Sequence, residues 1–250
     1  MLHGWSMSGR VWHFQKELAD SCRLIIPDLR GHGRSSSPVS GYLLENLVGD
    51  VVALFERLDL TEAVVLGWSI GSQVALAAFS LLQTRLAGLV LVGATSRFTT
   101  TDGYPWGLPV TELRGMGLRL RRDFNGTMEE FFRGMFAPEE LSCEQENRII
   151  REIVVEGPLP QQAVAQATLN ILASADLRAI LPEIRRPVLI IHGSSDTVCP
   201  PGAARYLAKR IPDARLVELN GVGHAPFLSR PVEFNAVLRS FLREKVYGRN

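Results

Sequence analysis

The chain has 250 residues, of which 46% are hydrophobic and 21% charged, so we expect one large domain with a sizeable core and exclude overall disorder. Lysine and arginine total 27 and aspartate and glutamate 26, a formal net charge of +1 that argues against a partner such as nucleic acid or an anionic membrane. The three cysteines, Cys22, Cys143 and Cys199, form no C-x-x-C pair, so neither a disulfide framework nor a structural zinc site is expected.

The start of the sequence has no basic segment followed by an apolar run, so we expect no signal peptide. The most apolar stretch, residues 63–79, is interrupted by glycine, serine and glutamine, and no apolar run approaches the roughly 20 residues that a membrane span needs. We therefore expect a soluble, cytoplasmic protein, and we expect it to be a monomer.

Short apolar runs alternate with longer helical patterns along most of the chain. In chain order the patterns predict a helix over 11–20, a strand over 24–26, a helix over 44–58, a strand over 63–66, a helix over 70–83, and strands over 89–92 and 188–191, then a helix over 203–211, a strand over 214–219 and a helix over 231–246. Apolar strands separated by helices are typical of a mostly parallel sheet with helices on both faces. The predicted fold class is α/β.

Residues 97–181 depart from this alternation. They contain no convincing strand, and glycine and proline turn signals separate helical patches at residues 129–135, 144–155 and 161–172. We interpret this segment as a helical cap inserted between two strands. The core of the fold would then be residues 1–96 together with residues 182–250.

The segment Gly67-Trp68-Ser69-Ile70-Gly71 matches the pattern G-x-S-x-G. It directly follows a predicted strand and begins a predicted helix, which is the context of a nucleophile elbow. The glycines allow a tight turn, and the helix N-terminus supplies backbone N–H groups and the positive end of the helix dipole. We predict Ser69 as a nucleophile; the alternative is a serine that merely caps the helix.

A serine nucleophile needs a base, and the base needs an acid that orients it. Asp196 follows the predicted strand 188–191, and His224 follows the strand 214–219. The order Ser, Asp, His, each after a strand, matches the α/β-hydrolase arrangement. The alternatives are an aspartate of a turn and an ordinary loop histidine. Since no His, Cys and Asp cluster has metal-ligand spacing, we predict neither a metal nor a cofactor.

Over nearly the whole chain, the sequence resembles the α/β-hydrolases that carry a helical cap. His3-Gly4-Trp5 is similar to the oxyanion-loop motif of that family, and residues 28–35 are similar to the turn after its fourth strand. The resemblance implies that the backbone N–H groups of Trp5 and Ile70 form an oxyanion hole. Each such donor stabilises the transition state by about 2.7–4 kcal/mol.

Three further segments resemble the carboxylesterases of biotin synthesis, which remove the methyl group from pimeloyl-acyl-carrier-protein methyl ester. They are Trp5 together with Gly67-Trp68-Ser69, the segment 175–178, and the segment 223–231. The resemblance implies a set of substrate contacts: Trp5, Ser69, Ile70, Phe131, Phe132, Met135 and His224. For Phe131, Phe132 and Met135, which would line the acyl channel, the alternative is ordinary cap core.

Acyl carrier proteins are acidic, so this resemblance also implies a basic docking face. Residues 97–178 hold 9 arginines and 12 acidic residues, a net of −3, so the cap as a whole does not indicate an acidic partner. It does contain a local basic stretch, which we take as the docking candidate: Arg114, Arg119, Arg121 and Arg122. The alternative is a set of solvated arginines on a helix face.

The N-terminal region departs from the family pattern. The family places a hairpin and a third strand ahead of the His-Gly motif, whereas Met1 and Leu2 precede His3 here. We expect either a chain that begins further upstream or a sheet with a central gap. Unpaired backbone groups beside such a gap would cost about 1–3 kcal/mol each if buried.

Together these features predict a serine carboxylesterase that acts on a small acyl ester, free or carried on acyl carrier protein. A general short-chain carboxylesterase, an enol-lactonase and a carbon–carbon bond hydrolase remain alternatives, because function depends on the pocket rather than on the fold. A non-catalytic binding protein with a hydrolase fold is the alternative from another class.

Overall fold

The computed structural model describes residues 1–154, 157–246 and 248, and it confirms the α/β fold class. One parallel sheet has the strand order β1-β2-β3-β4, formed by β1 (Ala63–Trp68), β2 (Leu86–Val92), β3 (Val188–Gly193) and β4 (Ala214–Leu219). The register places Leu91 opposite both Gly67 of β1 and Ile190 of β3. Because the strands are parallel, their carboxyl ends meet at one edge, where open α/β sheets place their ligands.

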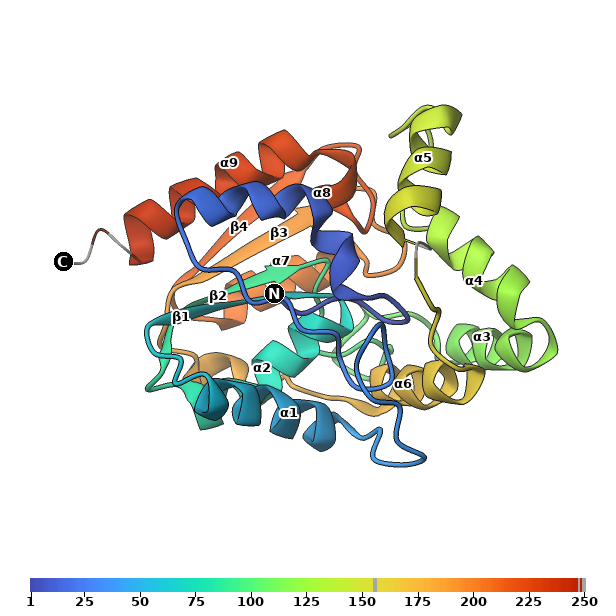
Figure 1. The fold of residues 1–250 in the computed structure, drawn as a ribbon, viewed down its shortest axis with the longest axis horizontal. Helices are drawn as coiled ribbons and strands as arrows, with labels where there is room; N and C mark the ends of the chain where they lie inside the picture. The colour runs from blue at the N-terminus through green and yellow to red at the C-terminus, as the bar shows by residue number, and fades with distance from the viewer. Residues whose placement is uncertain (155–156, 247, 249–250) are drawn as a thin grey trace.

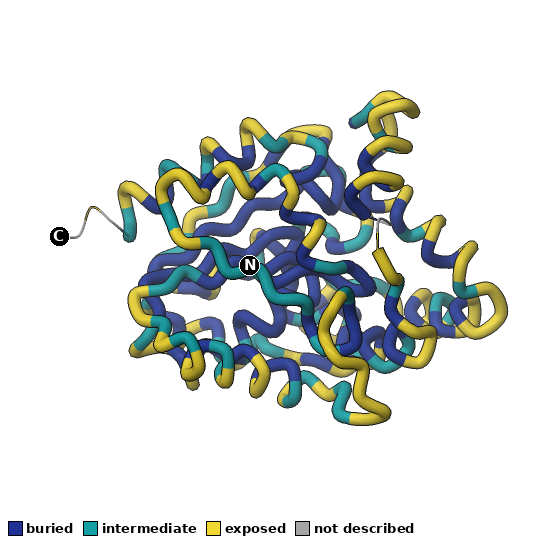
Figure 2. The backbone as a smooth tube through the Cα atoms, in the orientation of Figure 1, coloured by how far each residue is buried: buried dark blue, intermediate teal, exposed yellow. Residues whose placement is uncertain are grey.

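Helices cover both faces of this sheet. The helical elements of the core are η1 (Gly9–Asp20), α1 (Leu44–Arg57), α2 (Ile70–Leu82), α7 (Pro201–Arg210), α8 (Pro226–Ser229), α9 (Pro231–Phe241) and η4 (Leu242–Val246). Helices α1 and α2 lie on one face, and η1 and α9 lie on the other (Figure 1). Every residue of β2 and β3 is buried between these layers (Figure 2), which explains why their sequences are apolar apart from His192 near the end of β3.

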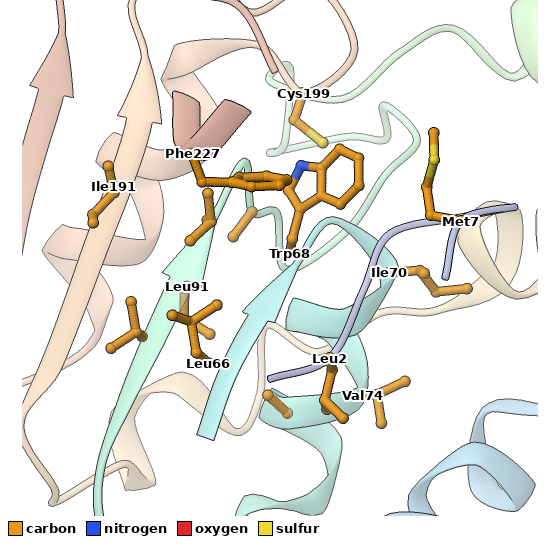
Figure 3. Close-up of a cluster of buried hydrophobic side chains, with 14 of the residues drawn as sticks. Leu2, Met7, Leu66, Trp68, Ile70, Val74, Leu91, Ile191, Cys199 and Phe227 are labelled. Carbon is orange, nitrogen blue, oxygen red and sulfur yellow. The ribbon is translucent and has the colours of Figure 1, made fainter. Parts of the chain in front are cut away.

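An aromatic cluster underlies the carboxyl edge of the sheet. Trp68, the last residue of β1, packs edge-on against Phe227 of α8 with ring centroids 4.9 Å apart. Phe227 in turn stacks against Trp12 of η1 at 4.4 Å. Figure 3 shows Trp68 and Phe227 above the aliphatic side chains of the strands, among them Leu66 and Leu91. The residue that precedes Ser69 is therefore held by tight packing.

Residues 97–181 form a helical segment at one end of the sheet (Figure 1). Its elements are α3 (Val110–Arg122), α4 (Phe124–Arg133), α5 (Cys143–Ile149), η2 (Ile150–Val154) and α6 (Gln162–Ser174), and η3 (Leu181–Glu183) begins at its last residue. Within the described residues of this segment only isolated bridges occur and no strand forms, as predicted. The helix predicted over 144–155 corresponds to α5 and η2, and its last residue, Val155, lies outside the described residues. Helix α3 was not predicted.

The strand predicted over 24–26 is wrong. These residues adopt no regular structure, and the carbonyl of Ile25 accepts a hydrogen bond from the Met1 amino group at 2.7 Å. Leu2 instead pairs with β1: its N–H donates to the Leu66 carbonyl at 2.7 Å, and its carbonyl accepts from the Trp68 N–H at 3.0 Å. A largely apolar groove of about 460 Å³ runs beside β1, lined by residues of the N-terminal segment, α1 and β1. Leu2 thus covers part of the edge of β1.

A membrane-spanning helix is absent from the described parts of the chain, since none of their helices has the necessary length and apolarity.

Candidate functional site

Ser69 occupies a sharp turn between β1 and α2. Its backbone has φ 55° and ψ −119°, a region that non-glycine residues rarely adopt, so the turn is strained. The Ser69 N–H donates to the Val92 carbonyl at 3.0 Å, which places the residue at the carboxyl end of β2. A Cβ on Gly67 would lie 2.3 Å from the Gly71 carbonyl oxygen, so the backbones approach too closely for any side chain there. The strand, turn and helix expected around this serine are all present.

His224 lies in the loop after β4, buried beside the same end of β2. A Cβ on Gly93, the residue after β2, would come within 2.8 Å of the His224 Nδ1 atom. Since Ser69 is bonded to Val92, the predicted nucleophile and base both lie at the carboxyl end of one strand. The imidazole Nε2 atom is buried and has no hydrogen-bond partner among the described residues. That nitrogen is therefore available to accept a proton.

Asp196 provides the acid that orients this imidazole. Its Oδ2 atom lies 2.8 Å from His224 Nδ1, and its Oδ1 atom accepts the backbone N–H groups of Val198 and Cys199 at 2.9 and 2.8 Å. Burial acts to raise the pKa of Asp196, but the charge and hydrogen bond of His224 and the contacts of His192 outweigh it and lower that pKa. The carboxylate thus stays ionised and holds the proton of His224 on Nδ1, which leaves Nε2 as the base.

His192, which the sequence did not indicate, also contacts the acid. Its Nε2 atom is 2.7 Å from the Cys199 carbonyl and 3.3 Å from Asp196 Oδ2. Burial lowers the pKa of His192, so the ring is neutral at physiological pH, and its Nε2–H donates a hydrogen bond to the Cys199 carbonyl. The signal in the sequence was its place four residues before Asp196 at the end of β3.

The loop of Trp5 passes over the start of α2. A Cβ on Gly71 would lie 2.5 Å from the Leu2 carbonyl oxygen and 2.7 Å from that of His3, so the loop rests directly on the helix N-terminus. No hydrogen-bond acceptor occurs in the described residues for the backbone N–H of Trp5 or of Ile70. This is the state that an oxyanion hole requires in the absence of substrate.

His3 ties this loop to the turn after residue 28. Its Nε2 atom accepts the Leu29 N–H at 2.9 Å, so its Nδ1–H donates to the Gly4 carbonyl at 2.8 Å. Burial, reinforced by the neighbouring His32, lowers the pKa of His3 to about 3. The ring therefore stays neutral at physiological pH, and this tautomer can make both hydrogen bonds.

A pocket of about 300 Å³ opens beside Ser69 and is walled by the helical segment. Trp5 and Phe131 line it and pack edge-on with ring centroids 5.0 Å apart, and the Trp5 indole N–H donates to the Ala165 carbonyl of α6. Phe132 and Met135 are buried but do not belong to the lining. Of the three expected channel residues, Phe131 alone faces this pocket.

The four arginines of the basic stretch all lie on α3, and all are exposed. Arg119 lines the same pocket, with its Nε atom 3.7 Å from a carboxylate oxygen of Glu130. Arg121 donates to the side-chain oxygen of Gln166 at 3.2 Å. The basic stretch is thus an outer helix face that reaches the mouth of the pocket through Arg119. Over the described ranges, no group of three or more His, Cys, Asp or Glu side chains could hold a metal ion.

The alpha/beta hydrolase fold family matches residues 1–231, and the chain belongs to that family, which confirms the resemblance seen in the motifs. The chain is 37% identical over 238 residues to the pimeloyl-[acyl-carrier protein] methyl ester esterase of Nitrosomonas europaea, covering 94% of this chain and 91% of the relative. The enzyme of the same name from Nitrosospira multiformis is 30% identical, covering 97% and 93%. Among solved structures, an esterase from Exiguobacterium antarcticum has a TM-score of 0.90 at 29% identity, covering 98% of this chain and 91% of that one.

Proposed function

We propose that this protein is a serine carboxylesterase that hydrolyses the methyl ester of pimeloyl-acyl carrier protein in biotin synthesis. The observation that carries the proposal is the buried Asp196–His224 pair, 2.8 Å apart, beside a serine in a strained strand-to-helix turn. The identity of 37% to the Nitrosomonas europaea esterase supports the choice of substrate. Cytoplasmic location and a monomeric state belong to the same proposal.

Ser69 Oγ attacks the ester carbonyl while His224 Nε2 takes its proton, and Asp196 stabilises the imidazolium that forms. The backbone N–H groups of Trp5 and Ile70 bind the oxyanion of the tetrahedral intermediate. His224 then returns the proton to the leaving methoxide, so methanol departs and an acyl-enzyme remains. Water, deprotonated by His224, hydrolyses the acyl-enzyme. Hydrogen bonds between nucleophile and base are often long without substrate, and they tighten in the complex.

In this proposal residues 97–181 form a cap over a core of residues 1–96 and 182–250. The cap supplies the pocket wall that receives the acyl chain, with Phe131 as a direct contact and Phe132 and Met135 as support behind it. The apolar lining around Ser69 suits a chain of methylene groups. Trp5 serves twice, through its backbone N–H and through a side chain buried between core and cap.

The exposed face of α3 is the proposed docking surface for the acidic carrier protein. Arg114, Arg119, Arg121 and Arg122 lie on this one helix, and Arg119 lies at the pocket. A carrier bound there would deliver its acyl chain to Ser69 directly. Charge pairs at the rim of an interface mainly raise the association rate and weaken with salt.

The test compares kcat/KM for pimeloyl-acyl-carrier-protein methyl ester with kcat/KM for free monomethyl pimelate. We expect the carrier-bound ester to be preferred by about 10²-fold or more, and the preference to fall about 10-fold in the double variant Arg114→Glu with Arg122→Glu. The variant Arg57→Glu, on α1 outside the helical segment, is the matched control. Equal kcat/KM for the two esters would reject the carrier-bound substrate.

A general carboxylesterase is the second candidate, favoured by the likeness to the Exiguobacterium antarcticum esterase. It would hydrolyse p-nitrophenyl butyrate and free monomethyl esters at rates similar to the carrier-bound ester. Labelling by a fluorophosphonate separates both esterases from a non-catalytic binding protein. Folded wild-type protein that took up no label would exclude the enzyme altogether.

A further inference from the structure

The loop that carries His224 is held by a segment of the chain that lies between α4 and α5. The His224 backbone N–H donates to the Met135 carbonyl at 2.7 Å. The side chain of Glu140 accepts two more backbone N–H groups on its Oε2 atom, from Gly223 at 2.8 Å and from Ala137 at 2.6 Å. One carboxylate oxygen thus joins the residue before His224 to a segment 83 positions earlier in the chain.

Glu140 is buried, with 6% of its surface exposed, which is unusual for a glutamate. A buried carboxylate costs several kcal/mol unless hydrogen bonds replace its water. Both hydrogen bonds go to Oε2, while Oε1 has no partner among the described residues. Within the described structure, the Glu140 side chain therefore bonds only the backbone N–H groups of Ala137 and Gly223.

The contact between the two segments is as close as backbones allow. A Cβ on Gly223 would lie 2.5 Å from the Met135 carbonyl oxygen and 2.7 Å from the Ala137 nitrogen. Gly223 is also close to Gly193, the last residue of β3. A Cβ on Gly193 would lie 2.1 Å from the Gly223 carbonyl oxygen. Gly223 is thus enclosed between β3 and the segment 135–140, and Glu140 closes the side that faces the cap.

The same segment continues the wall of the pocket. Phe131 and Gly134 line the pocket beside Ser69, and α4 ends at Arg133, two residues before Met135. The helix that would contact the acyl chain, α4, therefore continues directly into the segment 135–140, which bonds the backbone of residues 223 and 224.

We propose that Glu140 is a positioning residue for His224, which sets the place of the general base through the backbone N–H of Gly223. The inference rests on the proposed function, because it takes His224 as the base. Glu140 does not touch the reacting atoms. Its loss would free the residue before His224 on the cap side and let the imidazole leave the geometry that proton transfer needs. A displacement of about 1 Å can reduce a rate by about 10²-fold.

The experiment compares wild type with Glu140→Ala, Glu140→Gln and Glu140→Asp. For each protein it measures kcat and KM with p-nitrophenyl butyrate, the rate of fluorophosphonate labelling at Ser69, and Tm. Glutamine keeps the length and an oxygen acceptor, whereas aspartate keeps the charge but falls short by one methylene. We expect kcat and the labelling rate to fall 10- to 100-fold in Glu140→Ala and about 10-fold in Glu140→Asp, with KM within twofold. Glu140→Gln should recover to within about fivefold of wild type.

Glu144→Ala, an exposed glutamate in the first turn of α5, is the control and should leave all three readouts unchanged. If Glu140→Ala does not fold, the contrast between Glu140→Gln and Glu140→Asp decides alone. Unchanged kcat and labelling in the folded variants, or a change confined to Tm or KM, would overturn the positioning role. Wild-type protein without esterase activity or labelling would instead reject the proposed function.

Discussion

Ser69 and His224 reach the same edge of the sheet by different means. Ser69 is positioned by its sequence neighbours, since the strand before it, the helix after it and the glycines at 67 and 71 shape its turn. His224 is positioned by distant groups: the Trp68 indole N–H and the Met135 carbonyl bond its backbone, and Asp196 bonds its ring. A locally built site tolerates changes elsewhere in the molecule, whereas a site assembled from distant segments depends on how each of them packs.

The replacement of Ser69 by alanine should have the largest effect. It removes the proposed nucleophile but leaves the turn, so we expect kcat/KM for ester hydrolysis to fall at least about 10⁴-fold. Fluorophosphonate labelling should disappear, while Tm stays within a few degrees of wild type. Residual activity above one hundredth of wild type would show that another residue attacks the ester.

The replacement Gly71→Ala tests whether the local geometry of the elbow matters beyond the serine. The added Cβ would meet the Leu2 carbonyl at 2.5 Å, so the loop that carries the Trp5 N–H must move away from Ile70. We expect kcat to fall about 10²-fold, and the free energy of unfolding by about 1–3 kcal/mol. Gly49→Ala in α1 is the matched control, because nothing lies within 4 Å of its added Cβ. It should stabilise the helix by about 1 kcal/mol. A Gly71→Ala enzyme with wild-type kcat would refute the close approach.

The pH dependence of stability tests the burial of His3 beside the elbow. Its pKa is about 3 in the folded protein and 6.5 as the reference value, so the unfolded chain binds more protons between these limits. The stabilisation is complete above pH 6.5 and is lost as the pH falls from there toward 3. Between pH 7 and pH 5 this one group should lower the free energy of unfolding by about 2 kcal/mol, measured by urea denaturation.

His3→Gln should remove that share of the pH dependence, whatever its effect on stability at pH 7. An identical slope in wild type and His3→Gln would mean that His3 binds protons equally in the folded and unfolded protein, so that burial does not lower its pKa.

The smallest effect is expected from Asp123→Ala. Asp123 directly precedes α4, the helix that leads to Met135, whose carbonyl bonds the His224 backbone. The Asp123 side chain accepts the Gly126 N–H at 2.9 Å and caps α4. We expect a loss of about 1 kcal/mol in the free energy of unfolding, without a change at Ser69. Because α4 leads to Met135, kcat should fall by a factor of about 2 to 5. A large loss of stability without any change in kcat would show that the position of α4 does not affect His224.

The sequence was most informative where structure is local. The four strands of the sheet were predicted because each holds apolar residues bounded by turn residues, although Arg215 and Glu218 interrupt β4. Ser69 was predicted because its motif lies between a strand and a helix. The run 24–26 failed because it is short and, in the described structure, no neighbouring strand pairs with it. Helix α3 was missed because Gly115 and Gly117 interrupt its pattern.

The contacts of His192 and Glu140 were beyond the reach of sequence patterns. A histidine four residues before an aspartate is a common arrangement, and a glutamate two residues after a proline usually faces solvent. Both became notable only when folding buried them against backbone groups from other segments. Long-range packing leaves no periodic signal in one sequence.

The pairing of Arg97 with Asp176 has a consequence for how this molecule could be rebuilt. The two residues form an antiparallel bridge, the Leu177 N–H donates to the Ser96 carbonyl at 2.8 Å, and the Arg97 guanidinium lies 2.9 Å from the Asp176 carboxylate. The two ends of the helical segment 97–176 are therefore paired with each other. Segments whose ends meet in this way can be exchanged as units. A segment grafted from a related hydrolase between positions 97 and 176 would replace the wall of the pocket, and it would have to reproduce the Met135 carbonyl and the Glu140 carboxylate that bond the backbone of residues 223 and 224.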